Sequence, residues 1–243
     1  MTDDNVAWIE DMLRASKQAA GLPDDWGSTP TPLSAEAELE DAPRPARLRD
    51  GMTTAELLPY GDVVRTPDGQ DLVLERLTCP PVQTPGGGIA ACDPVSLEWQ
   101  GPPLQVDLRG TAQRVEVAAL RRTTPRGDLL QAAVAVVGDV SAVTSWIEFS
   151  DPGTRLSIDK GCGAFIARNQ VAVVAERVED RLSTVSDVGL VPVEVDGTMV
   201  GALFGSGDGP GGYEVMLGRD RGAMPVALLV DLRVLPRRAG RAS

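Results

Sequence analysis

From residue 52 onward, short apolar runs alternate with turn residues, and this pattern predicts a domain that consists mainly of β-strands. Runs such as VVRTPDGQDLVL, QRVEVAAL and VPVEVDGTMVGALF recur at roughly 8 to 15 residues, with Gly, Pro and Asp between them. The Asp196-Gly197 pair in the last of these runs is a strong hairpin signal. Strand spacing of this kind favours an antiparallel β-sandwich or barrel-like domain over alternating strands and helices.

Two segments have helical rather than strand spacing. The first is residues 3–20, where an apolar stripe follows Thr2 as a possible N-cap and ends before Gly21; its members are Val6, Ile9, Met12 and Leu13. The second is NQVAVVAERVEDRL, residues 169–182, in which Asn169 is the expected cap. The sequence therefore predicts an amphipathic N-terminal helix and one helix within the β-rich part.

Changes in composition divide the chain into four parts. The N-terminal helix occupies 1–20, and an acidic Pro/Ala-rich linker follows at 21–51. The β-rich domain spans 52–236, and a short basic tail covers 237–243.

Composition excludes several classes of function. The net charge of −12 disfavours nucleic acid as a partner, because phosphate binding requires a basic surface. No apolar run approaches the ~18 residues of a membrane span, and the acidic N-terminus lacks the apolar block of a secretory signal peptide. We therefore expect a cytoplasmic protein without a membrane partner.

The absence of histidine removes the commonest general base and metal ligand, and with it Ser-His-Asp and Cys-His catalysis. The three cysteines are widely spaced and match neither a disulfide framework nor a metal knuckle; they are Cys79, Cys92 and Cys162. The sequence therefore predicts neither a bound metal nor a cofactor.

The glycine-rich segment GSGDGPGGYEVMLGRDRG, residues 205–222, satisfies the GxGxxG pattern at Gly207, Gly209 and Gly212. A strand-like run, YEVML, follows it where a dinucleotide-binding loop requires a helix, and the segment lacks the lysine of a P-loop. Two interpretations stay open. The segment is a wide connection between strands whose glycines allow positive φ, or it is a binding loop with Asp208 at its tip and Tyr213 beside it.

Two further carboxylates and one thiol are candidate site residues. Asp93 precedes Pro94 and is also a typical turn residue, and Asp159 precedes Lys160, with which it could form a local ion pair. Cys162 lies between two glycines near Lys160, a setting that could activate a thiol but is equally that of a small buried residue. Carboxylates of this kind can act as acid and base or hold a hard cation.

Four segments in order resemble the bacterial family known as domain of unknown function 4241. They are GGGIAACDPVSLEW, LLQAAVAVVGDVSAVTSWIEF, SIDKGCGAFIA and GSGDGPGGYEVMLGRDRGAMPVALLVDLRVL, within roughly residues 60–236. The chain differs from the family pattern at Ala167, where the family has aspartate, and by the extra Pro210-Gly211. The resemblance implies a shared fold, and it implies a role near bacterial toxin-immunity and conflict systems.

Together these features predict a non-catalytic, cytoplasmic binding protein. The expected partner is another protein, and a basic one in particular, because an acidic surface speeds association with basic surfaces. The alternative is a histidine-free hydrolase or transferase that uses Asp208 with Asp159 or Cys162 in a glycine-lined cleft. Convergence of these residues with Asp93 in one pocket would favour the enzyme.

Overall fold

The computed structural model describes residues 48–65, 70–86, 88–97, 102–124, 127–149, 155–178, 184–185, 188–207 and 209–235. The chain divides into two compact units, Met1–Pro45 and Ala46–Ser243, and every described residue belongs to the second. The predicted N-terminal helix, most of the predicted linker and the predicted basic tail lie outside the described residues.

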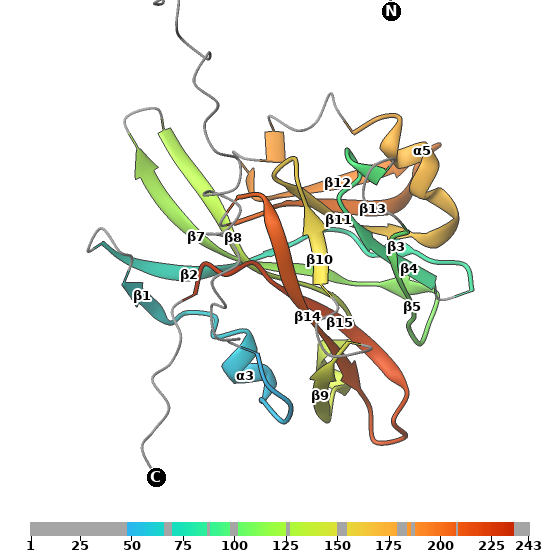
Figure 1. Cartoon of the computed structure of the whole chain (residues 1–243), viewed down its shortest axis with the longest axis horizontal. Helices are drawn as coiled ribbons and strands as arrows, with labels where there is room; N and C mark the ends of the chain where they lie inside the picture. The colour runs from blue at the N-terminus through green and yellow to red at the C-terminus, as the bar shows by residue number, and fades with distance from the viewer. Residues whose placement is uncertain are drawn as a thin grey trace, which may run out of the picture. The chain divides into compact units, whose positions relative to one another are not determined.

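The second unit is mainly β, as the spacing of apolar runs predicts, and its strands are antiparallel (Figure 1). The larger sheet has eight strands in the order β1-β2-β7-β8-β15-β14-β10, and β9 also pairs with β14. Its strands are β1 (Val63–Arg65), β2 (Asp71–Thr78), β7 (Val115–Thr124), β8 (Gly127–Gly138), β9 (Ser145–Glu148), β10 (Arg155–Ile158), β14 (Gly211–Arg219) and β15 (Pro225–Asp231).

A second sheet has five strands in the order β12-β13-β11-β4-β5, and a short two-stranded sheet joins β3 to β6. These strands are β3 (Val82–Gln83), β4 (Gly88–Cys92), β5 (Leu104–Asp107), β6 (Ala112–Gln113), β11 (Cys162–Ala167), β12 (Leu190–Val195) and β13 (Thr198–Gly205). The predicted hairpin at Asp196-Gly197 is confirmed, because both residues have positive φ, at 50° and 74°, and connect β12 to β13.

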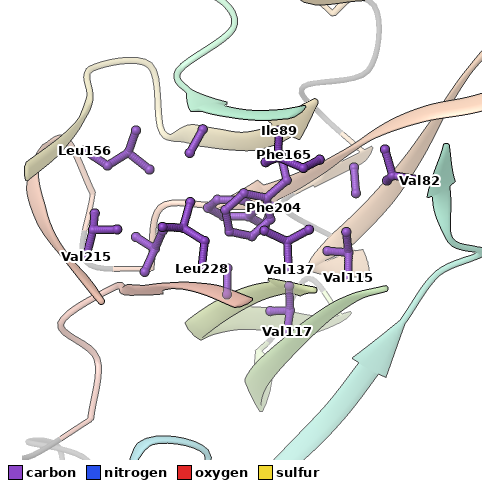
Figure 2. Packing of buried hydrophobic residues seen from close by; sticks show 14 of the residues in the cluster. Val82, Ile89, Val115, Val117, Val137, Leu156, Phe165, Phe204, Val215 and Leu228 are labelled. Carbon is purple, nitrogen blue, oxygen red and sulfur yellow. The ribbon is translucent and has the colours of Figure 1, made fainter. Parts of the chain in front are cut away.

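The main core lies between the two sheets (Figure 2). The rings of Phe165 and Phe204 from the smaller sheet pack at a tilt of 45°, with their centroids 4.9 Å apart, and face Val117, Val137 and Leu228 from the larger sheet. Side chains alternate between the two faces of a strand, so each sheet also has an outer face to cover.

Two smaller clusters cover these outer faces. The outer face of the larger sheet carries Leu74, Leu120 and Met216, which pack with Leu57 from the short helix α3 (Thr54–Leu57). The outer face of the smaller sheet carries Ile166 and Leu203, packed against α5 (Val171–Ala175). The described residues also include two single-turn 3-10 helices, η1 (Val140–Ala142) and η2 (Arg168–Gln170).

The described part corrects two details of the sequence analysis. In the described part of the helix predicted over 169–182, the α-helix is α5, and Asn169 lies in η2 rather than capping it. α5 ends in a tighter turn, in which the N–H of Arg177 bonds the carbonyl of Val174 at 3.0 Å. The compact unit also begins upstream of residue 52, since it includes residue 46 onward and buries Leu48.

Candidate functional site

Asp93 is completely buried, and backbone N–H groups surround its carboxylate. One oxygen accepts hydrogen bonds from the N–H of Asp159 at 2.8 Å and of Lys160 at 2.9 Å. The other accepts from the N–H of Val95 at 2.9 Å, which closes the turn predicted at Asp93-Pro94. Asp93 therefore ties the end of β4 to the β10–β11 turn, and its hydrogen bonds are directed at the protein itself.

Asp159 and Cys162 lie close to Asp93, but their side chains differ in exposure. The Asp159 side chain is exposed, and its link to Asp93 is made through its backbone. Cys162 is 2% exposed, and burial, with the nearby Asp93 charge, raises the pKa of its thiol to about 12. At pH 7 only about one thiol in 10⁵ would be ionised, and the thiolate is the reactive form.

Residues 206–210 of the glycine-rich segment connect β13 to β14, and β14 itself follows within the segment. The carbonyl of Gly207 accepts a hydrogen bond from Gln131 at 2.9 Å, and the carbonyl of Gly209 accepts one from the Tyr213 hydroxyl. The N–H of Ser206 bonds the carbonyl of Gly161 at 3.0 Å, so this loop lies beside the turn that Asp93 holds. Asp208 falls outside the described residues.

A cleft of about 520 Å³ lies elsewhere, on the outer face of the larger sheet, and sequence reasoning did not identify it. We call it the α3–η1 cleft, because these two short helices provide its walls. Its apolar lining comes from Ala55, Leu58, Val140 and Val143. Its polar lining includes Tyr60, Arg76, Arg114, Glu116, Asp139 and Ser141.

The cleft has a buried carboxylate on its floor. Glu116 is 6% exposed and accepts two hydrogen bonds from Arg76, one of them from Nε at 3.0 Å. The Tyr60 hydroxyl donates a third at 3.2 Å, and the Arg76 guanidinium lies 5.4 Å from the centre of the Tyr60 ring. The Glu116 hydrogen bond raises the pKa of Arg76, and burial together with Glu116 raises the pKa of Tyr60. Tyr60 therefore keeps its proton at neutral pH and lies beside the ion pair of Arg76 with Glu116.

Arg114 and Asp139 provide the remaining charges of the cleft. The Asp139 carboxylate accepts hydrogen bonds from the Ser141 hydroxyl at 2.5 Å and the Ser141 N–H at 3.1 Å, and these bonds lower its pKa. Arg114 attracts Asp139 electrostatically and has an exposed side chain. Among the described residues, the guanidinium of Arg114 makes no close ion pair and interacts with Asp139 only at longer range.

Glu116 has a signal in the sequence, although its partners do not. In VEVAAL it occupies the same strand parity as Ala118 and Leu120, so it faces an apolar surface where a carboxylate requires compensation. Arg76 lies 40 residues earlier and reaches Glu116 through the pairing of β2 with β7.

Within the described ranges, no group of three or more Cys, Asp or Glu side chains is arranged to hold a metal ion. None of the helices in that part of the chain is long and apolar enough to cross a membrane. Comparison of the chain with protein-family models, with curated proteins and with solved structures found no match. The resemblance to domain of unknown function 4241 therefore remains a prediction from the four segments.

Proposed function

We propose that this protein is a non-catalytic binding protein whose ligand occupies the α3–η1 cleft. The observation that supports this proposal is the pairing of the titratable groups on the cleft floor. Glu116 is engaged by Arg76 and Tyr60, so it is a poor general base. A cleft with apolar walls and a fixed ion pair is suited to holding a ligand in one orientation.

The partner that we propose is another protein, of basic character, met in the cytoplasm. The charge of −12 supports this, and the described residues carry 18 acidic and 14 basic side chains, a net of −4. Two thirds of the acidic surplus therefore belongs to residues outside the described ranges. The proposed setting, a bacterial toxin-immunity or conflict system, rests on the family resemblance alone.

The surroundings of two candidate residues weaken the alternative that the protein is an enzyme. Cys162 is buried with a raised pKa, and Asp159 meets Asp93 only through its backbone N–H. Asp208 lies outside the described residues, so its part in that alternative is carried by the sequence alone.

A cleft-filling variant tests the proposal. Ala55 lies on α3 with an exposed side chain that lines the cleft, so Ala55→Trp should occupy the cleft without disturbing the main core. We expect the tagged full chain to retain a stoichiometric partner from its host, and Ala55→Trp to lose it at unchanged melting temperature. Thr111→Trp, at an exposed position that does not line the cleft, is the matched control and should retain the partner.

Two results would contradict the proposal. One is a folded Ala55→Trp protein that keeps its partner as well as the parent does. The other is turnover of a substrate by the purified protein that Ala55→Trp abolishes, which would make the cleft an active site.

A further inference from the structure

We infer that the α3–η1 cleft binds an organic carboxylate, with the carboxylate at Arg114 and Arg76 and an apolar body between the α3 and η1 walls. The inference rests on the proposal that this cleft is the ligand site and adds the chemistry of the ligand. It is based on the hydrogen-bond donors and acceptors of the cleft side chains, which differ in how many already bond to other described residues.

Unused hydrogen-bond capacity in the cleft consists mainly of donors. A guanidinium has five N–H donors, and Arg76 directs two of them at Glu116, which leaves three. The Arg76 side chain is 53% exposed, so a ligand can reach part of its guanidinium. Arg114 adds a second guanidinium, which among the described residues is attracted by Asp139.

The acceptors, in contrast, are largely engaged. Both Glu116 oxygens are bonded, one to Arg76 and the other to Arg76 and Tyr60. One Asp139 oxygen receives both the hydroxyl and the N–H of Ser141. The Thr54 hydroxyl at the cleft wall accepts a hydrogen bond from the Trp146 indole at 3.1 Å. A ligand that brings acceptors therefore matches this cleft better than one that brings donors.

Charge favours a monoanion over a dianion. Two guanidinium groups attract a negative group, but the carboxylates of Glu116 and Asp139 lie in the same cleft and repel it. A carboxylate carries one negative charge and fits the planar guanidinium in a two-pronged arrangement. The four charged side chains of the cleft sum to zero, so a phosphate monoester, with nearly two negative charges at neutral pH, would leave a larger surplus of negative charge than a carboxylate.

Volume and lining indicate that the anion has an apolar body. A cleft of about 520 Å³ falls in the usual range for small-molecule sites, roughly 300–1,000 Å³. Ala55 and Leu58 on the α3 side and Val140 and Val143 on the η1 side give apolar contacts. A bare inorganic anion would leave these walls uncovered.

The test is calorimetric titration of the full-length protein with 3-phenylpropanoate and with its uncharged amide. We expect the acid to bind and the amide to bind about tenfold more weakly or not at all. Arg114→Gln should weaken acid binding about tenfold, whereas Asp139→Asn should strengthen it, since the asparagine oxygen can still accept from Ser141 while the competing charge is gone. Arg109→Gln, at an arginine paired with Asp220 outside the cleft, should change nothing.

A second pair of probes identifies the source of the carboxylate. A short peptide that ends in phenylalanine with a free carboxylate is compared with the same peptide amidated at its C-terminus. Tighter binding of the free-ended peptide than of 3-phenylpropanoate points to the terminus of a protein partner, and the reverse order points to a free metabolite. Both orders support the inference.

Three outcomes would overturn the inference: equal binding of acid and amide, tighter binding of phenyl phosphate than of 3-phenylpropanoate, or no binding of any carboxylate probe at millimolar concentration. The broader proposal has a separate readout. If Ala55→Trp loses its host partner while all carboxylate probes fail, the cleft is still the binding site and only its ligand chemistry is wrong.

Discussion

Glu214 on β14 lies directly opposite Asp231 on β15, so two carboxylates share the outer face of the larger sheet. On the other side of β14, Glu214 lies opposite Arg155 of β10. The N–H of Leu48 donates a hydrogen bond to the Glu214 carboxylate at 3.4 Å. Burial raises the pKa of Glu214, and Asp231 raises it further against the opposing effects of Leu48 and the arginines.

Replacing Glu214 with Gln should stabilise the protein at pH 7.5. A carboxyl group whose pKa is higher in the folded than in the unfolded protein binds its proton more tightly when folded. At a pH above the folded-state pKa the group is ionised, and its ionised form then lowers the free energy of unfolding. The gain from Glu214→Gln should disappear as the pH falls below the ordinary carboxyl range. The melting temperatures of the parent and of Glu214→Gln at pH 7.5 and pH 4 measure this gain in stability. Glu148→Gln, at an exposed position, is the control. A Gln variant that is less stable at pH 7.5 would show that the arginines dominate.

Asp93→Ala should cost about 3 kcal/mol or more in the free energy of unfolding. The substitution leaves three backbone N–H groups without their acceptor at a fully buried position. Urea denaturation measures the loss. Asp159→Ala, which removes only an exposed side chain, should stay within about 0.5 kcal/mol of the parent. Equal stability of the two variants would contradict the structural role of Asp93.

Gly207 and Gly209 should respond differently to alanine. Both have positive φ, at 67° and 98°, but a Cβ on Gly207 would lie 2.4 Å from the carbonyl oxygen of Ala132, whereas one on Gly209 would meet no atom within 4 Å. We expect Gly209→Ala to cost about 1 kcal/mol from backbone strain and Gly207→Ala clearly more. Thermal melts of the two variants compare these losses of stability. A larger loss for Gly209→Ala than for Gly207→Ala would mean that the loop has another conformation.

Leu48 should matter for stability although it lies in the predicted linker. Its side chain is 4% exposed and packs in the cluster that covers the larger sheet, so Leu48→Ala should cost about 2 kcal/mol or more. A chain that begins at residue 46 should retain the parent's urea midpoint, whereas one that begins at residue 52 should unfold at lower urea. Matching midpoints for these two chains would restore the boundary at residue 52.

The thiols of Cys92 and Cys162 should be unreactive in the native protein at pH 7. Both are buried, and burial raises the pKa of each to about 12. Maleimide labelling followed by mass spectrometry should find neither residue modified until urea unfolds the chain. Rapid labelling of Cys162 in the folded protein would revive its candidacy as a nucleophile.

The positions of strands could be predicted because they depend on local sequence. The alternation in QRVEVAAL and the Asp196-Gly197 turn specify β7 and the β12–β13 hairpin within a few residues. The turn at Asp93 is local in the same sense, since its bond to Val95 spans two residues.

The candidate site could not be predicted because its contacts are distant along the chain. Arg76 meets Glu116 only when β2 pairs with β7 in one register, and Asp93 meets Asp159 across 66 residues. The periodicity of one strand does not specify which strand becomes its neighbour, so a single sequence reveals that Glu116 needs a partner but not which residue it is.

The position of β8 in the larger sheet has a consequence for synthesis of the chain. Residues Ala132 to Val137 are buried on both faces, and in the described part of the chain the edge of β8 away from β7 pairs with β15, which begins 87 positions after β8 ends. At ordinary ribosomal speeds that interval lasts on the order of ten seconds. Throughout it an apolar strand with unpaired backbone groups is available to other nascent chains. Yield in a heterologous host should therefore depend on chaperone supply and growth temperature more than on the stability of the finished protein.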